Sequence, residues 1–172
     1  MCFLFFVTSC VRKFDYVDEV HRVTGLKIRQ LCKEENLSVA GSGGAMMDEI
    51  TKIKFTLDAR RRVDIKEARR LCVRCIEELK DAVNATESLK PYLSPYPFPA
   101  SGVRVGIMFS KKSGGYVDYG CAYLGTGGVS AVFQLNNMLY YSSFNPRTQL
   151  LEDYYEEPYE EALRLVQQSQ CE

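Results

Sequence analysis

The sequence predicts an α+β fold: an antiparallel sheet of about five strands with helices packed on one face, in the order α-β-α-β-β-β-β-α. Three observations support this class. Residues 65–82 carry one apolar stripe of helical period, several other segments alternate apolar and polar residues, and most of these alternating segments follow one another in the second half. Runs of strands, as opposed to strict alternation with helices, are typical of antiparallel sheets.

The first quarter of the chain predicts a helix followed by a loop. Residues 15–37 place apolar side chains at helical spacing, although Gly25 weakens the pattern. Residues 40–47 (AGSGGAMM) are rich in glycine and predict a flexible connector. They lack the lysine and the preceding strand of a phosphate-binding loop.

A strand and the clearest helix come next. In residues 52–58, Ile53, Phe55 and Leu57 alternate with polar side chains, which is typical of a strand with one wet face. From Ile65 onward apolar residues recur every three or four positions. Asp64 is expected to cap this helix.

The remaining segments are mostly strands. Residues 90–100 (KPYLSPYPFPA) hold four of the six prolines and predict a stiff connector. Alternation predicts one hairpin from residues 103–110 and 116–124. The sequence predicts a second hairpin, a short edge strand and a final helix in this order: 129–134 with 138–144 around Asn136-Asn137, 150–154, and Pro158 to about Gln167.

The N-terminal segment resembles a lipoprotein processing site. Residues 1–7 (MCFLFFV) are apolar but far shorter than the roughly 20 residues of a membrane-spanning helix. Residues 7–10 (VTSC) are similar to the lipobox at which bacteria cleave and attach lipid, which makes Cys10 the predicted site for acyl chains such as palmitate. We therefore expect a signal-like segment at 1–10 and a single domain at 11–172. The alternative is a packed apolar terminus of a cytoplasmic or secreted protein, since no basic residue precedes Arg12.

Further phrases extend the resemblance along nearly the whole chain: GSGGAMMDEI (41–50), VDIKEARRL (63–71), PYLSPYPF (91–98) and YEEPYEEALRLV (155–166). With the lipobox-like start, they resemble small lipoproteins of unassigned function from chlamydia-like bacteria. The resemblance implies a location in the bacterial envelope. It offers no catalytic residue to transfer.

The inventory of reactive side chains argues against several activities. The 22 basic and 22 acidic residues balance, so we expect no nucleic-acid partner. His21 is the only histidine, which disfavours Ser/His/Asp and Cys/His catalysis. Cys72 and Cys75 form a CxxC, but both lie in the apolar stripe, which favours core packing over zinc or redox chemistry. We expect no cofactor and no metal.

Tyrosines are the most distinctive feature that remains. Of the 11 tyrosines, Tyr92 and Tyr96 lie in the Pro-rich segment, and Tyr140 and Tyr141 must point to opposite faces of a strand. Exposed tyrosines make good contact surface. These four are the candidate binding residues for a protein, peptide or glycan, with the membrane reached through the N-terminal lipid. An enzyme with an unlocated carboxylate or tyrosine site is the alternative.

Overall fold

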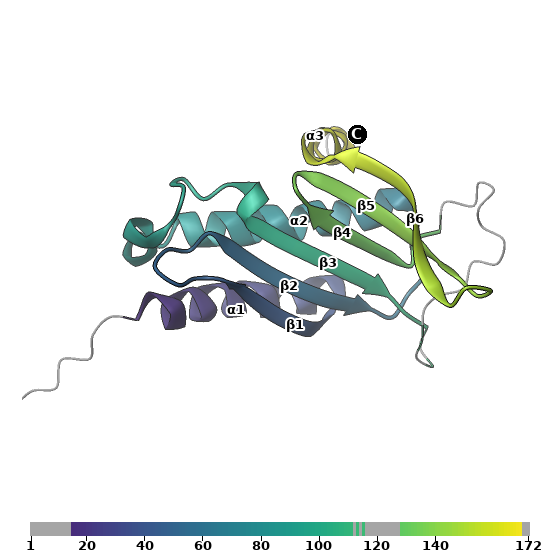
Figure 1. The fold of residues 1–172 in the computed structure, drawn as a ribbon, viewed down its shortest axis with the longest axis horizontal. Coiled ribbons are helices and arrows are strands. Elements are labelled where there is room, and N and C mark those ends of the chain that lie inside the picture. Colours follow the sequence, from purple (N-terminus) through teal and green to yellow (C-terminus); the bar gives the residue numbers. More distant parts are fainter. Residues whose placement is uncertain (1–14, 112, 114, 116–127, 170–172) are drawn as a thin grey trace, which may run out of the picture.

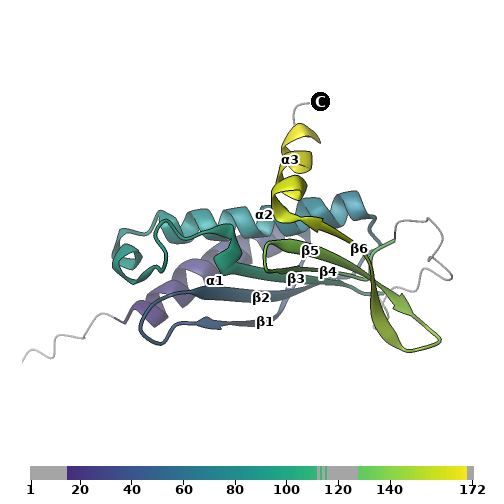
Figure 2. The same ribbon diagram turned by 45° about the horizontal axis from the view of Figure 1, so that its top comes forward.

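The computed structural model describes residues 15–111, 113, 115 and 128–169. The lipobox-like segment and the predicted strand 116–124 lie outside these residues. Within them the chain forms one six-stranded sheet in sequence order, with helices on one face (Figures 1 and 2). The strands are β1 (Ser38–Ala45), β2 (Lys52–Ala59), β3 (Val103–Phe109), β4 (Ala131–Leu135), β5 (Met138–Asn145) and β6 (Leu150–Pro158). The predicted α+β class is confirmed.

The helices follow the predicted segments closely. They are α1 (Tyr16–Glu35), α2 (Ile65–Asn84) and α3 (Tyr159–Ser169), with short 3-10 turns at Glu87–Tyr92 and Ala100–Gly102. Asp64 caps α2 by accepting a hydrogen bond from the backbone N–H of Glu67 at 2.8 Å. Cys72 and Cys75 are both fully buried, as the apolar stripe predicted.

One expectation about the sheet was incomplete. Strands β2 and β3 are parallel, from Ile53 beside Val103 to Ala59 beside Phe109, whereas the other neighbours are antiparallel. A parallel pair needs a long crossover, and α2 supplies it while packing its apolar stripe on the sheet. The sheet is therefore mixed, although mostly antiparallel.

The glycine-rich segment is the clearest error of the sequence analysis. Instead of a flexible connector it is the edge strand β1, which pairs with β2 through Gly41, Gly43 and Gly44. At Gly44 an added Cβ would lie 2.5 Å from the carbonyl oxygen of Lys52, so a side chain does not fit there. The strand buries no side chain, and it therefore lacks the apolar alternation that reveals other strands.

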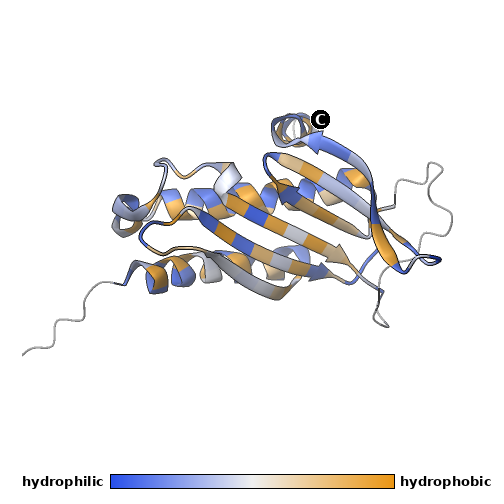
Figure 3. Cartoon of the chain, in the orientation of Figure 1, coloured by the Kyte–Doolittle hydropathy of each residue, from blue (hydrophilic) through white to orange (hydrophobic). Residues whose placement is uncertain are grey.

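The core lies between the sheet and the helices α1 and α2. Along β2 apolar and polar residues alternate, which Figure 3 shows as orange and blue bands, whereas β3 is mostly apolar and therefore mostly orange. The apolar members, such as Phe55, Leu57 and Ile107, face the helices and are buried. The Pro-rich segment is fastened to this body, because the Asn84 side chain bonds both the N–H and the carbonyl oxygen of Phe98, at 2.7 and 2.9 Å.

Candidate functional site

One face of the sheet is not covered by any described helix. Helices α1 and α2 lie behind the sheet in Figure 1, and α3 stands on the same side near β6. Because side chains alternate along a strand, the uncovered face collects the residues that the core does not use. We call this surface the open face; its central residues are Lys54, Thr56, Arg104, Gly106, Phe133, Leu135, Tyr140 and Glu156.

The register places five of these residues in one row across the sheet. Thr56 lies beside Gly106, Gly106 opposite Phe133, Phe133 opposite Tyr140, and Tyr140 opposite Glu156. Opposite residues on neighbouring strands have their Cβ atoms about 5 Å apart and interact directly. The row is aromatic at its centre and ends in a carboxylate.

A hollow lies beside this row. It has a volume of about 260 Å³ and is lined by side chains of β2, β3 and β4, among them Lys54, Arg104, Phe133 and Leu135. The Phe133 ring lies across Gly106, where an added Cβ would approach its Cδ1 atom to 2.7 Å. The missing side chain of Gly106 therefore lets the ring form part of the hollow.

Two cations stand side by side in the hollow. Lys54 and Arg104 are register partners on parallel strands, so their charged ends share one surface. Within the described part of the chain neither has an ion-pair partner. By contrast, three arginines of α2, Arg69, Arg70 and Arg74, each pair with a glutamate. Like charges on neighbouring strands repel each other, and no acidic side chain of the described residues forms an ion pair with either of them.

Tyr140 and Tyr141 point to opposite faces, as strand alternation requires. Tyr140 is half-buried on the open face. Tyr141 is fully buried on the helix side, where its hydroxyl donates to Glu157 and its ring lies 5.5 Å from that of Tyr155. Burial raises the pKa of Tyr141. Of this pair, Tyr140 is the one that a ligand can reach without opening the core.

Tyr92 and Tyr96 do not join this surface. They lie by the 3-10 turn Glu87–Tyr92, at the end of the molecule away from β5 (Figure 1). Tyr92 stacks on Tyr16 with ring centroids 4.4 Å apart, so one face of its ring is covered. Tyr96 is 51% exposed, with the Lys90 ammonium 5.8 Å from its ring centre. The four tyrosines thus form no single site.

A larger hollow of about 470 Å³ lies between α2 and α3, where two of the three basic side chains in its lining, Arg69 and Arg70, are held in ion pairs. Of the residues that line it, Arg69 donates to both carboxylate oxygens of Glu157, at 2.7 and 2.9 Å. Arg70 binds Glu35 and Glu67. These groups hold elements together, and they leave fewer free donors for a ligand than the open face does.

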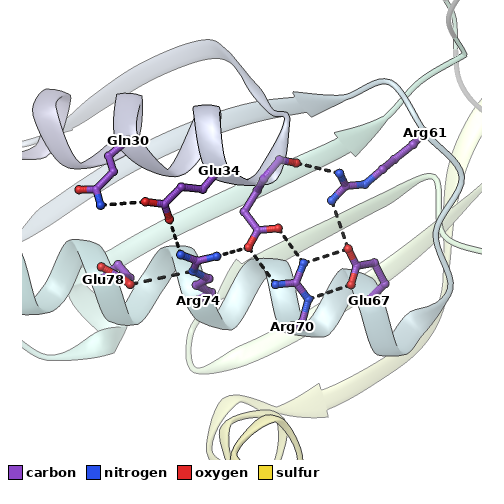
Figure 4. Close-up of polar contacts among 8 residues, drawn as sticks. Gln30, Glu34, Arg61, Glu67, Arg70, Arg74 and Glu78 are labelled. Atoms are coloured by element: carbon purple, nitrogen blue, oxygen red, sulfur yellow. Dashed lines mark hydrogen bonds and ion pairs between the residues drawn. The ribbon is translucent and has the colours of Figure 1, made fainter. Parts of the chain in front are cut away.

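Arg70 belongs to a network that joins α1 to α2 (Figure 4). Arg70 donates to the two carboxylate oxygens of Glu35 at 2.9 and 2.7 Å, and Arg74 donates to Glu35 and Glu34. The hydrogen bonds from Arg70 lower the pKa of Glu35 to about 2. We interpret this network as structural, because every strong donor in it already has a carboxylate.

The other reactive groups that the structure describes form no recognisable centre. His21 is exposed on α1, and Cys32, Cys72 and Cys75 are unpaired thiols. Burial raises the pKa of Cys75 to about 12 and that of Cys72 well above its usual range. No cluster of His, Cys, Asp and Glu suited to a metal occurs in residues 15–111 or 128–169.

The predicted lipidation residue, Cys10, lies outside the described residues. Among the helices that the structure describes, none is long and apolar enough to cross a membrane. The chain matches no model of a known protein family, no curated protein and no solved structure.

Sequence reasoning missed the hollow, although part of its signal was visible. Lys54 and Arg104 each occupy the polar side of an alternating segment, so both could be placed on a wet face. Their proximity depends on the parallel register of β2 and β3, which the sequence does not reveal. Phe133 was assigned to a strand, but its position over Gly106 depends on pairing between β3 and β4.

Proposed function

We propose that the protein is a noncatalytic binding module whose ligand lies on the open face, and that a lipid on Cys10 holds it at the bacterial envelope. The hollow around Phe133 carries the first part of this proposal. It combines an aromatic ring, an exposed leucine and two cations, which form no ion pair with any described residue, on a surface that no described helix covers. An aromatic and apolar centre with a few polar groups is typical of ligand sites.

The geometry favours binding over catalysis. The residues that line the hollow are two cations, a threonine, a glutamine and apolar residues, with no carboxylate among them. General acid–base catalysis usually relies on a His, Glu or Asp within about 3 Å of the reacting atoms. The two buried carboxylates among the described residues, Glu35 and Glu157, are held by arginines.

The open face can be tested with two matched leucines. Leu135 is 40% exposed in the hollow, and Leu26 is 51% exposed on α1. We would screen the full chain against an array of extended peptides and oligosaccharides, and repeat the screen with Leu135→Ser and Leu26→Ser. Ligands of the native chain should be lost with Leu135→Ser and kept with Leu26→Ser. Equal binding by both variants would place the ligand elsewhere, and release of a cleaved product would favour the enzyme alternative.

The lipid anchor rests on the sequence resemblance and needs its own test. The chain would be expressed in a bacterium that processes lipoproteins, as native protein, Cys10→Ala and the control Cys171→Ala. We expect a cleaved, acylated N-terminus and a membrane-bound fraction for the native protein and the control, and neither for Cys10→Ala. An unmodified Cys10 in native material would refute the anchor.

A further inference from the structure

We infer that the ligand of the open face is an extended acidic peptide, bound with one carboxylate between Lys54 and Arg104 and with an apolar side chain against Phe133 and Leu135. This inference rests on the proposed function and adds the chemistry of the ligand. Its starting point is the juxtaposition of two unpaired cations with an apolar hollow on one surface.

The two cations fit one carboxylate. Neighbouring strands lie about 4.8 Å apart, so a group between Lys54 and Arg104 meets both side chains. A guanidinium matches the two oxygens of a carboxylate in a bidentate geometry, and an ammonium adds a point charge. Binding an anion there would also relieve the repulsion between the two cations.

The apolar part of the hollow sets the spacing of the ligand. Leu135 and Phe133 belong to β4, one strand beyond Arg104, and the hollow spans β2 to β4. From the midpoint of β2 and β3 to β4 is about 7 Å. In an extended peptide, residues i and i+2 point the same way and are also about 7 Å apart. The preferred pattern is thus acidic, any residue, apolar.

The opposite end of the open face excludes a long polyanion. Glu156 closes the row beyond Tyr140, and within the described residues it has no ion-pair partner. A nucleic acid or polyuronate that crossed the sheet would meet this carboxylate. A neutral oligosaccharide would leave Lys54 and Arg104 uncompensated. A short peptide with one acidic residue pairs with Lys54 and Arg104 and does not extend to Glu156.

The test uses two peptides that differ in one charge. The probes are the acetylated, amidated pentapeptides Gly-Glu-Ser-Leu-Gly and Gly-Gln-Ser-Leu-Gly, titrated into the ¹⁵N-labelled full chain by NMR. We expect the Glu peptide to shift the amides of Lys54, Arg104 and Leu135, and to bind about tenfold more tightly than the Gln peptide. Replacing Lys54 and Arg104 together by Gln should abolish that preference.

The control is Lys33→Gln, which removes an exposed cation of α1 and should keep the tenfold preference. Equal binding of both peptides at the hollow would overturn the carboxylate inference and leave the proposed function standing. Binding of digalacturonate but of neither peptide would overturn the peptide as ligand. Shifts from the Glu peptide confined to other surfaces would overturn the inference as well, and the leucine variants would then decide the proposed function separately.

Discussion

Arg69 and Glu157, 88 residues apart in the chain, form a bidentate ion pair between α2 and the end of β6. Glu157 is 3% exposed and also accepts the hydroxyl of Tyr141. A buried carboxylate is costly unless hydrogen bonds satisfy its oxygens, and here the side chains of Arg69, Tyr141 and Tyr155 do so. The pair therefore holds the end of β6 against α2.

We predict that Arg69→Met destabilises the protein by about 3 kcal/mol, because it leaves the Glu157 carboxylate buried with no cation. Urea unfolding followed by circular dichroism measures the change. The matched control is Arg164→Met, which removes an exposed cation of α3 that pairs with Glu161 and should cost less than about 1 kcal/mol. Equal losses in the two variants would contradict the structural role of Arg69.

The Glu35 network predicts a loss of stability in acid. The pKa of Glu35 is lowered from 4.5 to about 2 in the folded protein, so its contribution is complete above about pH 4.5 and disappears as the pH falls towards 2. The shift sets an upper limit of about 3 kcal/mol, and the exposure of Arg70 and Arg74, about one third, reduces it to roughly 1–2 kcal/mol.

Glu35→Gln should lower the free energy of unfolding at pH 6 and flatten its dependence between pH 4.5 and 2. The control is Glu49→Gln, which replaces an exposed carboxylate of the loop before β2 and should leave the native pH profile unchanged. Urea titrations at several pH values measure both. A native-like acid profile for Glu35→Gln would mean that other carboxylates govern acid unfolding.

The buried thiols predict resistance to alkylation. With a pKa of about 12, Cys75 is a thiolate in about one molecule in ten thousand at pH 8, and Cys72 is also buried. In the native protein, iodoacetamide should modify neither residue within the time that labels them fully in urea. Mass spectrometry of peptides measures the sites. Rapid native labelling of Cys75 would show that the face of α2 towards the sheet opens easily.

Amphipathic periodicity explains why α1, α2 and β2 could be predicted from the sequence. Each of these elements buries one stripe of side chains, so apolar residues recur along the sequence with a period of 3.6 residues in a helix or 2 in a strand. Segment β1 buries none, so its glycines are typical of a loop until β2 is known to lie beside it. Tertiary pairing, not local propensity, makes it a strand.

Predicting the candidate site required the register of the strands, which the prediction of single helices and strands did not. Tyr140 was selected from the sequence and does lie on the open face, whereas Tyr141 proved to be a core residue. The sequence shows that a pair of adjacent strand residues splits between two faces, but it does not show which face the helices cover. Tyr140 lies opposite Phe133, and Phe133 lies opposite Gly106, which is 27 residues earlier in the chain.

Gly106 predicts a link between stability and binding. Gly106→Ala should destabilise the protein by about 1–3 kcal/mol, because the added Cβ would lie 2.7 Å from the Phe133 ring and force it to move. The same movement should reshape the hollow and weaken binding of the Glu peptide. The control is Gly43→Ala in β1, where an added Cβ meets nothing within 4 Å, and it should change neither property. Unchanged peptide binding by Gly106→Ala would show that Phe133 does not shape the ligand site.

Whereas Gly106→Ala should destabilise the protein, removing one of the two neighbouring cations of the open face should not. Arg104→Gln removes a like charge beside Lys54 and breaks no ion pair among the described residues, so unfolding should become harder by up to about 0.5 kcal/mol, or stay unchanged. Thermal and urea unfolding at low salt measure the difference, which should shrink as added salt screens the repulsion. A loss above about 1 kcal/mol would assign Arg104 a structural role. Neutral stability with weaker peptide binding is the expected combination, because a residue kept for a ligand stabilises the complex and not the fold.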